Sequence, residues 1–213
     1  MLYLKLTEEQ KLQVLLGLFV GCIVMANLLG TKIADFGIFA ASVGIFAYPI
    51  TFLVTDIVAD VYGKGKVKGF IISGLIVNIV MFLLVALSVW LPPASRYESN
   101  AAYMEVFNPS MRIILASVIA FLISQTHDMV AFEFWKKKTK GRFLWFRNNT
   151  STILSQFIDT VIFMFVAFYM VTPSFTADFV FALIIPYWLV KVLVALLDTP
   201  FVYLGVWWLK GKK

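Results

Sequence analysis

Cysteine, histidine and charged residues are all scarce in this chain of 213 residues. It has one cysteine, Cys22, and one histidine, His127. A lone cysteine excludes an intramolecular disulfide and a cluster of cysteine ligands, and a lone histidine argues against a histidine-based zinc site. Charged residues make up 14% of the chain, against about 25% in soluble proteins. We therefore expect no metal site and no cofactor.

Apolar residues are correspondingly abundant. The chain is 61% hydrophobic and its mean hydropathy is +0.89. A membrane-spanning helix needs roughly 20 mostly apolar residues, whereas open β-structure cannot cross lipid because its unpaired backbone groups would stay unsatisfied. We predict an all-α integral membrane protein, one transmembrane domain over residues 1–213 with six transmembrane helices. The expected spans are 12–31, 38–60, 69–91, 112–134, 153–172 and 179–208.

The net charge of +6 is distributed in a way that indicates topology rather than nucleic-acid binding. Fourteen of the eighteen basic residues fall in both termini, in the connection after the second expected span and in the connection after the fourth. The longest polar connection, 92–109, has only one of them. Because cytoplasmic loops are enriched in Lys and Arg, we predict cytoplasmic N and C termini and an external 92–109 connection. The expected partners are membrane lipid and a small molecule, and no nucleic acid.

Ionisable and amide side chains recur inside the expected spans and share helix faces. Asp56 and Asp60 are four residues apart, which places them on one face of a helix. Thr152, Gln156 and Asp159 follow a helical spacing as well. In chain order, the polar residues that we single out are Asn27, Lys32, Thr51, Thr55, Asp56, Asp60, Asn78, Ser124, Gln125, His127, Asp128, Thr152, Ser155, Gln156, Asp159, Tyr187, Lys191 and Asp198.

The acids decide which way these faces turn. Each carboxylate at mid-bilayer costs about 2.5–3.5 kcal/mol, so five facing lipid would cost roughly 12–18 kcal/mol, whereas a whole protein is stable by only about 5–15 kcal/mol. We therefore expect the polar faces to surround a shared hydrated cavity. Lys191 would neutralise one acid there, although a purely structural ion pair is an alternative. Asp56 or Asp60 is a candidate for proton coupling, and His127 is either a proton relay or a side chain bonded to a neighbour.

The chemistry of the expected cavity suits a small planar heterocycle. A carboxylate accepts hydrogen bonds from adjacent N–H groups, an amide both donates and accepts, and aromatic rings offer stacking. Amino acids and protons are alternative substrates that these side chains also suit.

Several stretches together resemble the queuosine precursor transporter family, also described as a family of vitamin uptake transporters. They are MANLLGTKI (25–33), YPITFLVTDIVADVYGKGK (48–66), SQTHDMVAFEFWKKKTKGRFLWFRNNTSTILSQFIDT (124–160) and YWLVKVLVALLDTP (187–200). The pattern R-N-N-x-S-T-x-x-S-Q-x-x-D-T, from Arg147 to Thr160, is the most specific. One departure is Asp60, where the family has Glu before Val61-Tyr62-Gly63.

The resemblance implies a multi-pass protein of the cell inner membrane, not an enzyme, that imports 7-deazaguanines such as 7-cyano-7-deazaguanine for salvage into queuosine. It implies substrate binding by Asn27, Lys32, Asp56, Asp60, Gln125, Asn149, Gln156, Asp159 and Lys191. Our candidates for gating or coupling are Asp56, Asp60, Asp128, Arg147 and Asp198. We expect secondary, proton-coupled transport; the substrate-binding subunit of an ATP-driven vitamin importer is the alternative.

Two further alternatives and one possible assembly stay open. An intramembrane enzyme would need a nucleophile and a base, for which Ser155 and His127 are the available pair. A structural scaffold would tolerate neutral replacements of the intramembrane acids. The GLFVG stretch with Gly17 and Gly21 fits a helix-packing face, which could serve a homodimer.

Overall fold

The computed structural model describes residues 6–30, 32–35, 37, 40–170, 173 and 176–210. Lys5, Lys212 and Lys213, which contribute to the topology prediction, lie outside these residues, as do the last two residues of the expected 153–172 span. Six helices are long and apolar enough to cross a membrane. The prediction of an all-α membrane protein with six transmembrane helices is therefore confirmed.

The first helix starts at a clear local sequence signal. Helix α1 (Glu8–Leu29) starts at a capping box, in which Thr7 and Gln10 bond each other's backbone N–H groups. The remaining long helices are α3 (Lys64–Trp90), α4 (Asn100–Lys138), α5 (Leu144–Phe168) and α6 (Ala177–Lys210). Helix α6 continues through Pro186 and Pro200; each proline lacks an N–H donor and so removes one helical hydrogen bond.

Among the described residues, the expected span 38–60 starts too early, because Ala40–Ser42 form a strand and the spanning segment is Val43–Tyr62. Strands β1 (Ile33–Asp35) and β2 (Ala40–Ser42) form an antiparallel pair, and the 3-10 helix η1 (Val43–Phe46) precedes α2 (Tyr48–Tyr62). Pro49 in the first turn of α2 marks the real helix start. Hydropathy alone missed the boundary because it counts apolar residues whatever their backbone conformation.

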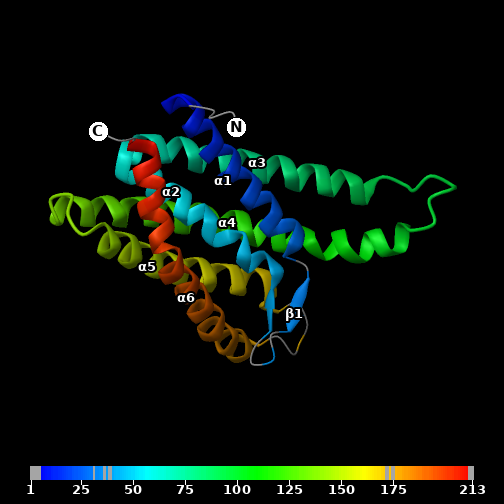
Figure 1. Cartoon of the computed structure of the whole chain (residues 1–213). Helices are drawn as coiled ribbons and strands as arrows, with labels where there is room; N and C mark the ends of the chain where they lie inside the picture. Colours follow the sequence, from blue (N-terminus) through cyan, green and yellow to red (C-terminus); the bar gives the residue numbers. More distant parts are fainter. Residues whose placement is uncertain are drawn as a thin grey trace.

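Helix α2 is short and central. Its 15 residues span about 22 Å at 1.5 Å per residue, less than the roughly 30 Å hydrocarbon core. Together with η1 it forms the span Val43–Tyr62, which is the most buried of the six candidate spans at 61%, so the polar side chains of this span face protein rather than lipid. Figure 1 shows α2 among the other helices, between α1 and α6.

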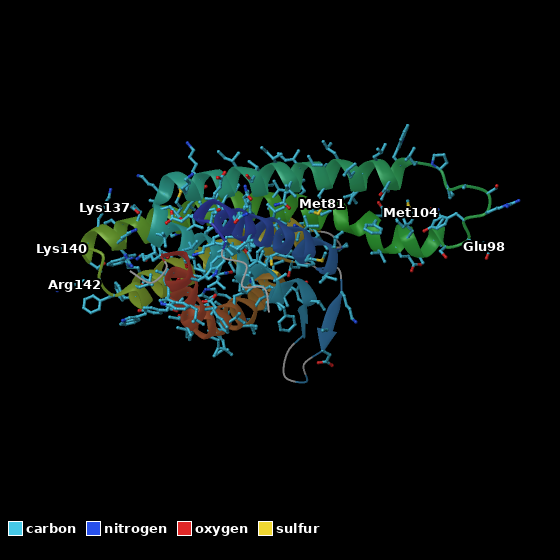
Figure 2. All side chains as sticks on the ribbon, turned by 45° about the horizontal axis from the view of Figure 1, so that its top comes forward. Met81, Glu98, Met104, Lys137, Lys140 and Arg142 are labelled. Atoms are coloured by element: carbon cyan, nitrogen blue, oxygen red, sulfur yellow. The ribbon has the colours of Figure 1, made fainter. Side chains whose placement is uncertain are left out.

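Helices α3 and α4 extend beyond the rest of the bundle as a long pair (Figures 1 and 2). The 39 residues of α4 correspond to about 58 Å. The prediction of a polar connection over 92–109 is therefore wrong in its second half, because α4 already starts at Asn100. Phe107 explains this early start, since it packs on Met81, Val85 and Ile114 of the two helices.

The connections fall at two ends of the bundle. The first turns of α1 and the last turns of α6 meet, since Lys11 donates to the Trp208 carbonyl at 2.6 Å. Lys137, Lys140 and Arg142 lie at one end in Figure 2, and Glu98 lies at the tip of the α3–α4 pair at the other. We call the end with Lys137, Lys140 and Arg142 the terminal end, and the end with Glu98, at the tip of the α3–α4 pair, the hairpin end. The basic connections thus share the terminal end with both termini.

Candidate functional site

A cavity of about 60 Å³ lies toward the hairpin end, enough for a few water molecules. Residues of α1, the β1–β2 strand pair, η1, α2, α4, α5 and α6 line it. They are Ala26, Asn27, Gly30, Ser42, Gly44, Ile45, Tyr48, Ile113, Ser117, Asp159, Phe163, Tyr187 and Lys191. Aromatic rings and polar groups therefore meet in one place.

Asp159 is the polar centre of this cavity. Its Oδ2 accepts from Lys191 Nζ at 2.8 Å, and its Oδ1 accepts from Tyr48 Oη at 2.6 Å and from Ser124 Oγ at 3.0 Å. Lys191 Nζ also lies 5.0 Å from the ring centre of Tyr48 and 5.5 Å from that of Tyr187, within cation–π range. A buried carboxylate is thus held by one cation and two hydroxyls that a ligand with N–H groups could replace.

Close backbone packing at η1 shapes the cavity wall. A methyl group at Gly44 would lie 2.5 Å from the Ala26 carbonyl oxygen of α1, so only glycine allows η1 to approach so closely. Ser42 stabilises this approach by donating to the Gly30 carbonyl at 2.7 Å. On the same helix, Asn27 donates to Asn78 Oδ1 of α3 at 3.0 Å.

Buried amides lie below the cavity. Gln125 is fully buried and bonds Thr51 and Thr55 of α2, both at 3.4 Å. Gln156 is also fully buried, and neither its donor nor its acceptor has a partner among the described residues. Gln156 thus has unused hydrogen-bonding capacity one turn from Asp159. Because an unsatisfied buried polar atom costs about 1–3 kcal/mol, a ligand or water that bonds this amide would gain stability.

Three acids lie deeper in the bundle. Asp56 is 2% exposed and accepts from Thr152 Oγ1 at 3.0 Å. Asp128 is 1% exposed, interacts with Asp56, and keeps Oδ1 without a donor. Asp198 of α6 is close enough to Asp128 to interact with it electrostatically. None of the three forms an ion pair in the described part of the chain, so three full negative charges here would cost roughly 8–10 kcal/mol.

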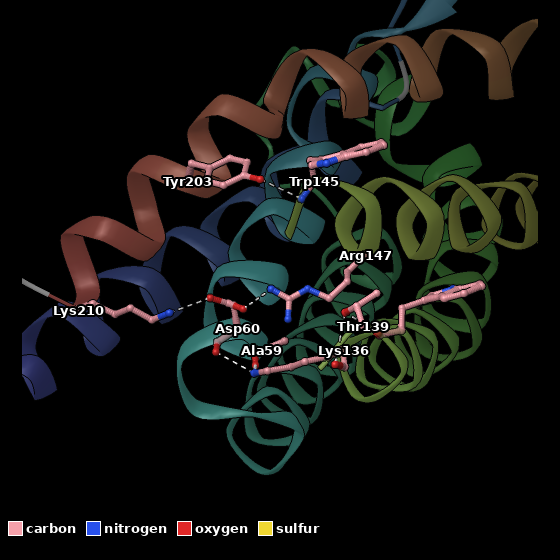
Figure 3. Close-up of polar contacts among 9 residues, drawn as sticks. Ala59, Asp60, Lys136, Thr139, Trp145, Arg147, Tyr203 and Lys210 are labelled. Carbon is pink, nitrogen blue, oxygen red and sulfur yellow. Dashed lines mark hydrogen bonds and ion pairs between the residues drawn. The ribbon is translucent and has the colours of Figure 1, made fainter. Parts of the chain in front are cut away.

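A cluster of ion pairs closes the terminal end (Figure 3). Arg147 Nη2 lies 2.6 Å from Asp60 Oδ1, and Lys210 Nζ lies 3.1 Å from Asp60 Oδ2. Lys136 donates to the carbonyls of Ala59 and Asp60. The cluster, which we call the inner gate, thus joins α2, α4, α5 and α6 through four side chains and the Ala59 carbonyl.

These contacts form a polar seam between α2 and α5. The links are Tyr48–Asp159, Asp56–Thr152 and Asp60–Arg147. As the numbers rise along α2 they fall along α5, so the links follow a regular antiparallel register. Few backbone positions of the two helices lie close to each other, so side chains carry most of the contact. The seam runs from the cavity to the inner gate.

The structure separates the predicted residues by depth. Asn27, Asp159 and Lys191 line the cavity, Gln125 and Gln156 lie below it, and Asp56, Asp128 and Asp198 form the acid group. Asp60 and Arg147 belong to the inner gate. Asn149 bonds Thr199 of α6 at 3.0 Å nearby. Lys32 is exposed beside β1 and does not line the cavity. The roles of these residues stay predictions.

Sequence analysis missed several cavity residues: Ser42, Tyr48, Ser117 and Phe163. Tyr48 had a readable signal, because Tyr48, Thr51 and Thr55 follow the spacing i, i+3, i+7 of one helix face. Ser42 had none, since it reaches the cavity only through the unexpected hairpin. His127 Nδ1 lies 2.8 Å from Ser155 Oγ, yet Ser155 donates to the Ser151 carbonyl and neither residue lines the cavity.

Comparison with known proteins gives two kinds of match. The profile of a family described as "Putative vitamin uptake transporter" matches residues 42–205. A protein of Bacillus subtilis (strain 168) named "Probable queuosine precursor transporter" is 31% identical over 192 residues, covering 88% of this chain and 82% of that protein. The "Queuosine precursor transporter" of Escherichia coli (strain K12) is 26% identical over 139 residues, covering 63% and 58%. No solved structure matches.

Proposed function

Because this chain belongs to the putative vitamin uptake transporter family and is a multi-pass membrane protein, we propose that it imports queuosine precursors across the cell inner membrane. The substrate class is 7-deazaguanines such as 7-cyano-7-deazaguanine, and the mode is secondary transport coupled to protons. The names of the two relatives support this class. The observation that carries the proposal is a cavity in which aromatic rings surround a buried carboxylate.

The cavity offers a complementary group for each part of such a heterocycle. Tyr48, Tyr187 and Phe163 provide ring faces, and stacking on an aromatic side chain is worth about 1–3 kcal/mol per base. Asp159 accepts from adjacent N–H groups of the ring edge, while the substrate displaces Tyr48 or Lys191 from it. Asn27 at the wall and Gln156 beneath provide amide groups for the remaining polar atoms.

The closed inner gate supports an inward direction of transport. With the termini in the cytoplasm, the cavity lies toward the outside and the gate lies between it and the cytoplasm. Substrate would enter the cavity from the hairpin end and leave at the terminal end after Asp60 and Arg147 separate. A homodimer that uses Gly17 and Gly21 remains part of the proposal, and neither glycine has a neighbouring atom where a side chain would stand.

The test is uptake of labelled 7-cyano-7-deazaguanine by liposomes that contain only this protein. We expect uptake by the wild type and loss of at least tenfold in Asp159→Asn, because the neutral amide replaces an acceptor that N–H donors need. Asp178→Asn, which removes an exposed acid of α6, is the matched control and should keep full uptake. Undiminished uptake by Asp159→Asn would refute the binding role.

The same assay separates the two modes of transport. Uptake without ATP or any other protein supports secondary transport. Uptake only after an ATP-hydrolysing module is added, together with co-purification of that module, supports the substrate-binding subunit instead. Growth of a strain that cannot make deazaguanines but can use them, on limiting precursor with and without this chain, tests the function in cells.

A further inference from the structure

We propose that the Asp56–Asp128 pair, in the middle of the α2–α5 seam, is the site that carries the co-transported proton. The inference rests on the proposed function and adds to it the place where the coupling ion binds. The site lies between the cavity and the inner gate. Its α2 side chain, Asp56, is on the same helix as Tyr48 at the cavity and Asp60 at the gate.

Two adjacent buried carboxyls, one of which has an acceptor oxygen without a donor, form a site that favours one shared proton. The two buried carboxyls interact with each other, and Asp128 Oδ1 is an acceptor without a donor. A proton on either carboxyl supplies that donor and removes one of two adjacent negative charges. The hydroxyls of Ser151, Thr152 and Ser155 lie around Asp128 and can hydrogen bond to either protonation state.

In the part of the chain that the structure describes, no ion pair involves Asp56 or Asp128. Lys191 is bound to Asp159, and Arg147 and Lys210 are bound to Asp60. The histidine ring of His127, next to Asp128 in α4, is directed to Ser155. From α6 the pair faces Asp198, a third acid. The charged residues of α1 are Glu8, Glu9 and Lys11, and those of α3 are Lys64, Lys66 and Lys68, all near the start of each helix.

A second observation indicates that the interior is built to accept a ligand near this pair. Gln156 is fully buried and both of its amide atoms are unpartnered. It lies one helical turn from Thr152, which bonds Asp56, and about one turn from Asp159. Its free donor and acceptor can therefore bond a water or a substrate atom between the cavity and the acid pair.

The seam explains how the proton and the substrate would be coupled. Helix α2 is held to α5 by Tyr48–Asp159 at the cavity and by Asp56–Thr152 two turns deeper. Substrate competes for the first link and protonation weakens the second, because a neutral carboxyl is a weaker acceptor. When both links are weakened, α2 can move relative to α5 and open the Asp60–Arg147 link. The pair releases its proton to the cytoplasm once the open gate connects the pair with the cytoplasm.

The experiment uses liposomes containing the intact protein and 7-cyano-7-deazaguanine. Exchange of labelled for unlabelled substrate needs no coupling ion, whereas accumulation in response to a pH gradient does. With one unit of gradient, alkaline inside, the wild type should accumulate substrate about tenfold if one proton moves per substrate. Asp56→Asn and Asp128→Asn should both lose the accumulation, and Asp128→Asn should keep exchange within about threefold.

Controls separate the possible results. Asp178→Asn should keep both exchange and accumulation, and Asp56→Glu, which retains a carboxyl, should keep a response to the gradient. Accumulation that survives in Asp56→Asn or Asp128→Asn would overturn the site, as would its loss in Asp198→Asn alone. Exchange without any response in the wild type would overturn the inference but not the proposed function. Absence of exchange in the wild type would count against the proposed function.

A measurement that needs no transport covers variants that fold poorly. Infrared difference spectra of the wild type between acidic and alkaline pH should contain a band from a protonated carboxyl. We expect Asp56→Glu to shift this band and Asp178→Asn to leave it in place. A band unaffected by Asp56→Glu would contradict the proton site.

Discussion

Asp159 and Lys191 are an ion pair whose two side chains are at most 5% exposed. A buried pair of this kind contributes little net stability, because the attraction between the charges only offsets the cost of removing both from water. Removing one partner is different, since it leaves a charge that is buried and unpaired. The pair is therefore better explained by ligand binding than by stability of the fold.

This argument predicts a specific pattern in a double-variant experiment. Asp159→Asn should lower the free energy of unfolding by about 3–5 kcal/mol, because Lys191 then lacks its counter-charge. Asp159→Asn combined with Lys191→Met should recover most of that loss without recovering transport. Thermal unfolding in detergent with and without substrate measures both effects. Equal stability of the single and the double variant would show that the charges are not coupled.

Helix α2 and its approach through η1 determine where the cavity lies. Gly44 allows η1 to reach the carbonyl end of α1, and the turn at Gly63, with a φ of +76°, sends the chain directly from α2 into α3. A residue with a side chain rarely adopts that backbone angle. The short central helix thus depends on glycine at both ends.

Gly44→Ala tests the first of these positions. The added methyl group would meet the Ala26 carbonyl at 2.5 Å, so we expect a loss of about 1–3 kcal/mol in stability together with weaker substrate binding. Gly69→Ala in α3 is the control, because nothing lies within 4 Å of its new Cβ; it should be neutral or stabilising by about 0.5–1 kcal/mol. Unfolding temperature and equilibrium binding report the two effects. Normal binding by Gly44→Ala would show that η1 can shift without cost to the cavity.

The bundle as a unit has a polar seam inside and an apolar surface outside. Large apolar side chains such as Leu83, Leu84 and Leu197 are exposed on its outer faces, as expected of a surface that meets lipid. The basic residues gather at the terminal end (Figure 2), which the positive-inside rule assigns to the cytoplasm. From this asymmetry and the even number of spans we predict that both termini lie in the cytoplasm.

Labelling with a membrane-impermeant thiol reagent checks the orientation. In a Cys22→Ser background, Glu98→Cys should react in intact cells, because Glu98 is exposed at the hairpin end. Lys137→Cys should react only after the cells are permeabilised, because Lys137 is exposed at the terminal end. The Cys22→Ser protein without an added cysteine gives the background. The reverse pattern would place the termini outside.

The number of spans, the family and the inward-facing acids all follow from the chain as a string of residues. Apolar runs near 20 residues long have one stable solution in lipid, and five acids distributed over those runs are too costly to face it. Even the register of α5 is readable, since Thr152, Gln156 and Asp159 share one helix face. These properties depend on neighbours in sequence, so a sequence argument reaches them.

Which acid meets which partner depends on neighbours in space. Asp60 and Asp56 are one turn apart on α2, yet the packing of α4, α5 and α6 gives Asp60 two cations and Asp56 a threonine and a second acid. The hairpin that carries Ser42 and the early start of α4 likewise depend on contacts with α1 and α3. The helix register set by packing between distant segments decides these pairings, and local periodicity contains no information about it.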